Sequence, residues 1–223
     1  GSWSRKRSRS SANASTLAPQ AGVFSLHFIF RDKDHLAKTL ADPGVSKAFR
    51  DMIKESVQGT QVLGLMTMGM RNIYSKKEIK SVDDLKGQKI RVQATKTEDT
   101  HFPAYGTQTV HMPFGEVYTS LQTGVVDMAE NGINNYLINK HYEVAPTLSL
   151  TGHEANNSVL FVSDKVWSSL NDDQKKLFEE RHDLDFAFEI PNLSRFRANV
   201  LVQRLGVAGV FRLVPSKVLS LEE

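Results

Sequence analysis

Cysteine is absent from the 223 residues, so disulfides, thiolate metal sites and cysteine nucleophiles are all excluded. Long apolar runs are missing too: the longest candidate, residues 23–30, is far shorter than the roughly 18 residues that span a bilayer, and it contains His27. The sequence has no HExxH, GxSxG, Walker A or GxGxxG motif. Zinc-peptidase, nucleophile-elbow and phosphate-loop chemistry therefore have no support, and we expect no cofactor.

Net positive charge is also scarce once one segment is set aside. The formal charge is +3, but Arg5, Lys6, Arg7 and Arg9 stand together near the N-terminus, and without these four, 24 basic residues face 25 acidic ones. We interpret residues 1–20 as a basic, disordered leader. The alternative is a nucleic-acid-binding patch, but no other basic or aromatic cluster extends it, so we expect no nucleic-acid partner.

Segments with strand and helix periodicity alternate along the chain, which predicts an α/β fold with a largely parallel sheet. Strands are expected over residues 60–75, where a glycine-rich bend follows, and over 88–93, 125–128 and 207–214. A helix over 114–123 should end at Gly124. Further helices are expected around Leu36 and Leu40, along Val45, Phe49 and Ile53, from the N-cap Asn171 towards Ile190, and over 199–206; residues 23–30 are an apolar run typical of buried chain.

Polar side chains stand where the predicted strands end. Arg71 follows a glycine-rich strand end, Arg91 lies inside the short strand "KIRV", and Asn131 follows the strand 125–128. Ligands of open α/β sheets bind beyond the carboxyl ends of strands, and a guanidinium fork matches a carboxylate. The pattern therefore indicates a carboxylate site. A structural salt bridge to an acidic side chain is the alternative reading of each arginine.

Catalytic and metal readings have less support. Glu116, Asp127 and Glu130 resemble an acid/base set, but the helix dipole accounts for Glu116, and Asp127 suits a structural acceptor at a strand end. No two of the seven histidines stand at i, i+4, although His141 and His153 flank a possible strand. We expect neither an enzyme nor a metal site.

Several segments in order resemble the solute-binding proteins of TRAP (tripartite ATP-independent periplasmic) transporters, the DctP-like family. They are "GVFSLHFIFRD", "GMRNIYSKKEIKSVDDLKGQKIRV", "MPFGEVYTSLQTGVVDMAEN", "KHYEVAPTLSLTGHEANN" and "LFVSDKVWSSLNDDQKK". The resemblance implies a two-lobed fold of the periplasmic-binding (type II) kind that closes on an organic acid and delivers it to a sodium-coupled membrane permease. It also implies a periplasmic location and a monomer.

Site residues follow from the resemblance, position by position. Arg91 matches the arginine that pairs with the ligand carboxylate, Arg71 a second pocket arginine, and Asn131 an amide that contacts the ligand. Phe114 matches an aromatic residue packed against the ligand, and Glu130 lies next to the site. The acid itself is left open among C4-dicarboxylates, keto acids and sugar acids.

The sequence departs from the family in ways that affect the expected function. Histidine stands at His27 and glutamine at Gln93 where the family usually has proline, and the segment that precedes "GVFSL" in the family has no counterpart here. The first lobe is therefore expected to be incomplete. We assign residues 21–68 and 157–190 to its remnant with a connecting helix, and 69–156 and 191–223 to a ligand-binding second lobe. A truncated relic or interaction module that binds no solute is the main alternative.

Overall fold

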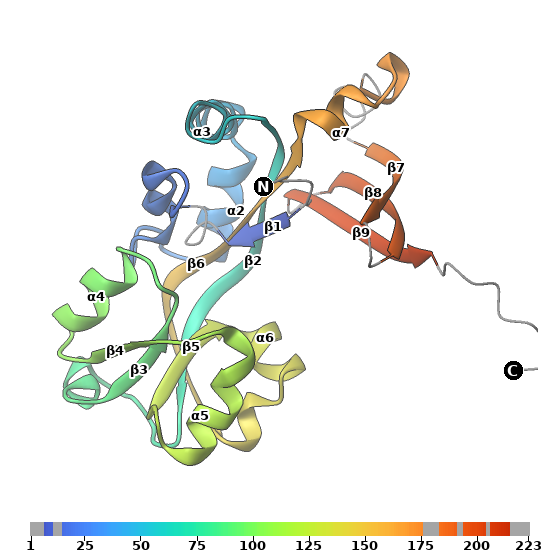
Figure 1. Cartoon of the computed structure of the whole chain (residues 1–223). Helices are drawn as coiled ribbons and strands as arrows, with labels where there is room; N and C mark the ends of the chain where they lie inside the picture. The colour runs from blue at the N-terminus through green and yellow to red at the C-terminus, as the bar shows by residue number, and fades with distance from the viewer. Residues whose placement is uncertain (1–6, 11–14, 176–182, 191–193, 204–205, 215–223) are drawn as a thin grey trace, which may run out of the picture.

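Two long strands organise the molecule. The computed structural model describes residues 7–10, 15–175, 183–190, 194–203 and 206–214. β2 (Thr60–Ser75) and β6 (Thr147–Ser163) pair antiparallel along most of their length. In Figure 1 they run from a mixed sheet with its helices at the bottom to a group of helices at the top. The two ends of the molecule therefore share one pair of strands.

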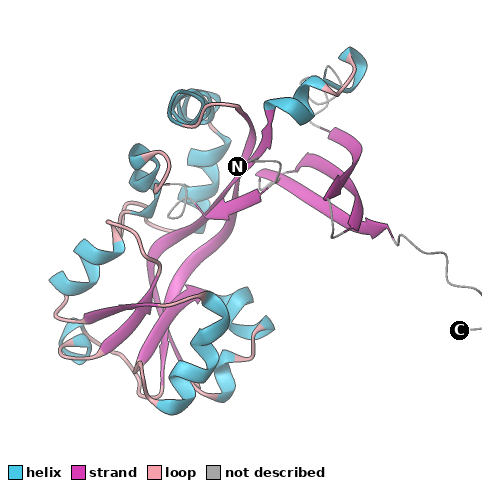
Figure 2. Ribbon diagram, viewed as in Figure 1, coloured by secondary structure: helices cyan, strands magenta, loops and turns pink. Residues whose placement is uncertain are grey.

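The lower part is a sheet with helices on both sides, as Figure 2 shows. β3 (Lys89–Val92) lies between β4 (Gln108–His111) and β5 (Met128–Gly132) and is parallel to both, and β5 continues antiparallel to β2. The helices of this part are α4 (Glu98–Ala104), α5 (Val117–Thr123) and α6 (Ile133–Ile138), with short 3-10 turns η2 (Val82–Leu85), η3 (Phe114–Glu116) and η4 (His141–Glu143).

The predicted largely parallel sheet is wrong. Among the described strands only the pairs of β3 with β4 and β5 are parallel, and every other pair is antiparallel. Alternation of strands and helices indicates crossovers, but it does not reveal that two long strands return through the sheet in opposite directions. The pairing order is set by contacts far apart in sequence, which periodicity does not report.

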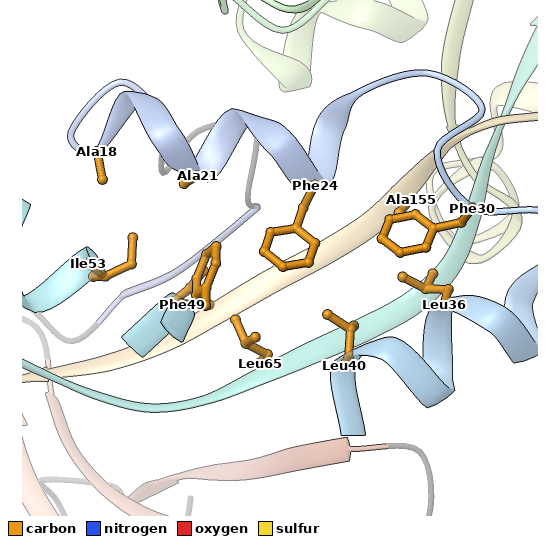
Figure 3. Packing of buried hydrophobic residues seen from close by; sticks show 11 residues of the cluster. Ala18, Ala21, Phe24, Phe30, Leu36, Leu40, Phe49, Ile53, Leu65 and Ala155 are labelled. Atoms are coloured by element: carbon orange, nitrogen blue, oxygen red, sulfur yellow. The ribbon is translucent and has the colours of Figure 1, made fainter. Parts of the chain in front are cut away.

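Helices cover the upper part of the two long strands. α2 (Lys33–Ala41) begins at Asp32, whose carboxylate accepts hydrogen bonds from two backbone N–H groups. α3 (Pro43–Ser56) begins at Asp42, whose carboxylate accepts a hydrogen bond from the Val45 N–H, with Pro43 at the first helical position. The 3-10 helix η1 (Pro19–Ser25) lies beside them. Figure 3 shows the apolar side chains that these elements bring together. The members include Phe24, Phe30, Leu36, Leu40, Phe49, Ile53, Leu65 and Ala155.

The predicted helix stripes are confirmed, and the predicted buried run is only partly right. Leu36, Leu40, Phe49 and Ile53 are buried as their spacing indicates. Residues 23–30, in contrast, form the end of η1 and turns, in which Phe24 and Phe30 are buried while Val23, Leu26, Phe28 and Ile29 are exposed. Half of that apolar run therefore faces outwards.

The C-terminal part is β structure where a helix is predicted. The backbone N–H of Asn171 donates to the side-chain oxygen of Gln174, and the backbone N–H of Gln174 donates to the side-chain oxygen of Asn171, as expected for a helix start. Residues 176–182 of that predicted helix lie outside the described residues, and β7 (Asp183–Ile190) takes up the rest. "DLDFAFEI" alternates apolar and other residues with period two, the strand pattern that the helix prediction overlooked. The remaining elements are α7 (Asp164–Ser168), β8 (Ser194–Gln203) and β9 (Gly206–Val214).

β8 replaces the helix predicted over 199–206, whose residues 204–205 lie outside the described part, while β9 confirms the strand predicted over 207–214. β7, β8 and β9 pair antiparallel in order, and Met66 in β2 pairs with Gly206 in β9. The division of the chain into lobes by residue range stays a prediction.

Part of the segment predicted as a disordered leader is structured. β1 (Arg7–Ser10) pairs antiparallel with β6 over residues 158–161, and Ala18 is fully buried. Residues 1–6 and 11–14 lie outside the described residues. The edge of β6 offers backbone groups to a neighbouring strand, a partner that composition does not reveal. No helix in the described part of the chain is long and apolar enough to cross a membrane.

Candidate functional site

β5 carries the polar residues that the sequence placed beyond a strand end. It begins at Met128, whereas residues 125–127 precede it, and Val125 is 54% exposed. The predicted strand 125–128 is therefore shifted. Glu130 and Asn131 lie inside the strand and are buried, and Asp127 accepts a hydrogen bond from the Lys89 backbone N–H, the structural role expected for it. Gly124 ends α5 with φ of 77°, as predicted.

Alternation along β5 divides the predicted site residues between two faces of the sheet. Arg91 stands opposite Ala129 in the parallel pair of β3 and β5, so it shares a face with Ala129 and Asn131. Ile73 stands opposite Glu130 in the pair of β2 and β5, and Arg71, two residues before Ile73, shares that face with Glu130. The two arginines therefore lie on opposite faces, although the sequence placed them at one mouth.

Arg91 is a buried cation that has no carboxylate partner among the described residues. Its Nε and Nη2 donate to the Met112 carbonyl at 3.3 and 2.9 Å, and its guanidinium lies 5.7 Å from the ring centroid of Phe114. No carboxylate of the described residues lies within 4.0 Å of it. Burial lowers the pKa of Arg91, because the charged form loses its hydration. A guanidinium does not shed its proton, so it favours an anion at this place.

Asn131 lies on the same face of the sheet as Arg91, and the Phe114 ring lies beside the Arg91 guanidinium. The side-chain oxygen of Asn131 accepts from the Gly132 backbone N–H at 2.8 Å and from Asn135 Nδ2 at 2.7 Å, which fixes the orientation of the amide. With its oxygen engaged, Asn131 has only N–H donors left to offer, which suits an anion. Phe114 is about one-third exposed and also packs against His141, with ring centroids 5.6 Å apart.

Arg71, in contrast, is already paired. Gly69, with φ of 90°, sits at an irregularity of β2, but the strand continues through it, so Arg71 lies within the strand and not after its end. Its Nε and Nη2 donate to the two carboxylate oxygens of Glu130, each at 2.5 Å, and its Nε lies 3.0 Å from a Glu154 oxygen. The salt-bridge alternative therefore describes Arg71 as it stands here.

The opposite charges of Arg71 and Glu130 offset the unfavourable free energy of burying each of them. Burial opposes the charged form of Arg71, but the carboxylates of Glu130 and Glu154 outweigh it and raise the pKa of Arg71. Burial likewise favours the protonated form of Glu130, but the guanidinium of Arg71 outweighs it and lowers the pKa of Glu130. Both groups remain charged, with Arg71 2% and Glu130 0% exposed.

Four further polar residues lie beside Arg71. His27 and His153 drew attention in the sequence for other reasons, and Glu98 and Glu154 did not. Glu98, His153 and Glu154 are buried with His27 next to the Arg71–Glu130 pair, and atoms of His27, His153 and Glu154 lie within 4.8 Å of one another, which makes them a possible metal-ligand set. The run "GHEANNS" in the middle of a long buried strand was the available signal, because polar residues in such a position need partners.

A two-lobed α/β binding protein is the class that this fold and the buried cation define. The family model described as "Bacterial extracellular solute-binding protein, family 7" (DctP) matches residues 8–185. The chain belongs to this family, which confirms the resemblance stated from the sequence, and the predicted two-lobed periplasmic-binding fold is confirmed by its structural relatives.

Three relatives illustrate which proteins the chain is similar to. The chain is 37% identical to the 2,3-diketo-L-gulonate-binding periplasmic protein of Escherichia coli over 70% of its own length and 47% of that protein. A TRAP periplasmic solute-binding protein from Pseudomonas putida F1 with bound D-glucuronate superposes with a TM-score of 0.73 at 34% identity, over 78% of this chain and 56% of the other. A TRAP periplasmic solute-binding protein from Shewanella oneidensis with bound succinate superposes with a TM-score of 0.71 at 29% identity, over 78% of this chain and 56% of the other. The chain spans about half the length of these relatives.

Proposed function

We propose that this chain binds the carboxylate of a small organic acid as a solute-binding protein of a TRAP transporter, for delivery to a sodium-coupled membrane permease. One observation carries the proposal: Arg91 is a buried guanidinium that faces Phe114 and has no carboxylate partner among the described residues. The ligand carboxylate would supply the missing negative charge, which repays the desolvation of the cation.

The roles of the neighbouring residues follow from their contacts. Asn131 donates an amide N–H to the acid, since its own oxygen is engaged, and Phe114 packs against the carbon skeleton. Arg71 and Glu130 act from the other face of the sheet, where their ion pair holds β2 against β5. Relatives with bound glucuronate, galacturonate and succinate support sugar acids and C4-dicarboxylates as the classes to test first.

Thermal unfolding of the purified chain with D-glucuronate, D-galacturonate and succinate tests the proposal. A ligand at a hundred times its dissociation constant adds about 2.7 kcal/mol to the free energy of unfolding and raises the melting temperature by several degrees. Arg91→Ala should weaken binding by about 2–5 kcal/mol in calorimetry, because a buried charge would lose its partner. Arg50→Ala, which removes an exposed arginine of α3, is the matched control.

Two outcomes would contradict the proposal. Equal affinity of wild type and Arg91→Ala would remove Arg91 from the site. A cooperative melt with no shift for any acid would favour the alternative, a folded module that binds no solute. The same proposal includes a periplasmic location, a monomeric state, and the absence of catalysis and of nucleic-acid binding. Size-exclusion chromatography tests the monomeric state. Incubation of the protein with the bound acid, followed by mass spectrometry, tests whether the acid is converted.

A further inference from the structure

Four buried side chains from three parts of the chain meet on the face of the sheet that carries Arg71. His27 follows η1, Glu98 lies in the first turn of α4, and His153 and Glu154 lie next to each other in β6. The exposed fraction of each side chain is at most 3%. Such a concentration of ionisable groups away from water needs a source of compensation.

Each histidine uses one ring nitrogen in a hydrogen bond. In the described part of the chain, the other nitrogen faces only a more distant carboxylate oxygen: Glu98 lies 3.9 Å from His27 Nε2, and Glu130 lies 3.7 Å from His153 Nε2. Nδ1 of His27 lies 3.1 Å from the Tyr105 hydroxyl, and Nδ1 of His153 lies 2.7 Å from the Thr151 hydroxyl. Nε2 of each ring is buried and has no hydrogen-bond partner among the described residues. Metal-bound histidines show this arrangement, in which a hydrogen bond at one nitrogen orients the ring and directs the lone pair of the other at the ion.

The carboxyl groups show the same deficit. Oε2 of Glu98 and Oε2 of Glu154 are buried and accept no hydrogen bond from the described residues. The Glu154 oxygen lies 3.0 Å from Arg71 Nε, but the hydrogen of that nitrogen is donated to Glu130. Glu98, Glu130 and Glu154 together face one cation, Arg71, whose strongest contacts go to Glu130. Two negative charges therefore stay uncompensated if all three acids ionise, and a divalent cation would balance them.

A backbone hydrogen bond connects the two segments that carry His27 and His153. Phe28, directly after His27, has φ of 59°. This left-handed conformation is unfavourable for any residue that has a Cβ. Its N–H donates to the carbonyl of His153 at 2.7 Å. The turn that carries His27 is therefore held on β6 at the residue that carries the second imidazole. A surface pocket lined in part by Phe28, Tyr105 and His153 reaches one residue of the cluster.

We propose that His27 Nε2, His153 Nε2 and a Glu154 oxygen bind a divalent transition-metal ion, with Zn²⁺ preferred, and that Glu98 balances its second charge. Two imidazoles and a carboxylate select Zn²⁺ over Mg²⁺ or Ca²⁺, which prefer oxygen. Ligand atoms of tetrahedral zinc are about 3.3 Å apart, so separations of up to 4.8 Å between the three ligand atoms would shorten by at most about 1.5 Å when the ion binds. The ion would fasten the turn after η1 to β6.

Isothermal titration of the untagged, EDTA-treated chain with ZnCl₂ alone tests this site. We expect one ion per chain, with a dissociation constant in the micromolar range or below, and no binding of Mg²⁺ at the same concentration. His27→Gln and His153→Gln should each weaken zinc binding at least tenfold. His111→Gln is the matched control, because His111 is an exposed histidine that lies 2.7 Å from the Asp99 carboxylate, and it should leave zinc affinity unchanged.

X-ray absorption spectroscopy of the zinc-loaded wild type provides a readout that does not depend on folding of the variants. Two imidazoles among the ligands are expected. A folded wild type that takes up no stoichiometric zinc, a coordination sphere with fewer than two imidazoles, or zinc affinity that is lost in His111→Gln and kept in His27→Gln would each overturn the proposal. The outcome is independent of the organic-acid proposal, because Arg91 lies on the other face of the sheet.

Discussion

The side chain of Arg71 keeps its charge inside the protein because two carboxylates face it, and it is the residue on which the candidate site most depends for stability. We expect Arg71→Ala to lower the free energy of unfolding by about 3–5 kcal/mol, since Glu130 would be left buried and unpaired. Lys47→Ala, which breaks an exposed pair with Asp51, should have a far smaller effect, because water screens that pair. Urea unfolding measures both; similar losses would contradict the assigned importance of burial.

The protonation of Glu98 should give the protein a characteristic pH dependence. Burial raises the pKa of Glu98 to about 8, with the charge of Glu130 adding to the effect, from an ordinary value of 4.5. Between these values the folded state holds a proton that the unfolded chain has lost, so the free energy of unfolding falls as pH rises. The slope is at most about 1.4 kcal/mol per pH unit for one proton. Glu154, whose pKa is also raised, acts in the same direction.

Comparison of wild type with Glu98→Gln isolates this contribution. Burial lowers the pKa of His27 to about 4, so that histidine increases stability with rising pH from about 4 to its ordinary value of 6.5 and is silent above it. Between pH 6.5 and 8, with EDTA present, wild type should lose stability more steeply than Glu98→Gln, in which Glu154 alone retains the effect. Equal slopes in denaturant titrations would remove Glu98 as the cause.

At the scale of elements, α5 depends on the residue that ends it. Gly124 has φ of 77°, which a residue with a Cβ adopts only with strain, so Gly124→Ala should destabilise the protein by about 1 kcal/mol. Gly115→Ala in the adjoining turn is the control, because its φ is not positive and an added Cβ would meet no atom within 4 Å. Thermal unfolding distinguishes them. Equal melting temperatures for both variants would show that α5 does not need this cap.

Local signals predicted local structure well. The helix start at Asn171, the end of α5 at Gly124 and the apolar stripes of α2 and α3 were visible in the sequence, because each involves residues within one or two turns. The antiparallel return of β6 along β2 was not, since it joins residues about ninety positions apart. β7 was missed for a different reason. The clear helix start at Asn171 led to a helix prediction that extended over residues 183–190, whose period-two pattern is typical of a strand.

The site also divides into features that local sequence predicts and features that depend on long-range pairing. Arg91 is recognisable alone, as a charged residue between two buried strand positions, Ile90 and Val92. Its separation from Arg71 depends on the register of β3 and β2 against β5, which the sequence does not encode locally. The roles of Arg71, Arg91, Phe114, Glu130 and Asn131 in ligand binding remain predictions, to be decided by the binding experiments.

At the scale of the whole molecule, β2 and β6 should make the upper and lower parts unfold together. Phe49 belongs to the upper apolar cluster and Phe102 to one of the lower clusters, and both are buried. Replacing either by alanine should cost about 3–5 kcal/mol. Because both clusters pack on strands that run through the two parts, each variant should move one common transition. Circular dichroism at far-ultraviolet and near-ultraviolet wavelengths should give coincident curves. Two separate transitions, each moved by only one of the substitutions, would show instead that the long strands do not couple the parts.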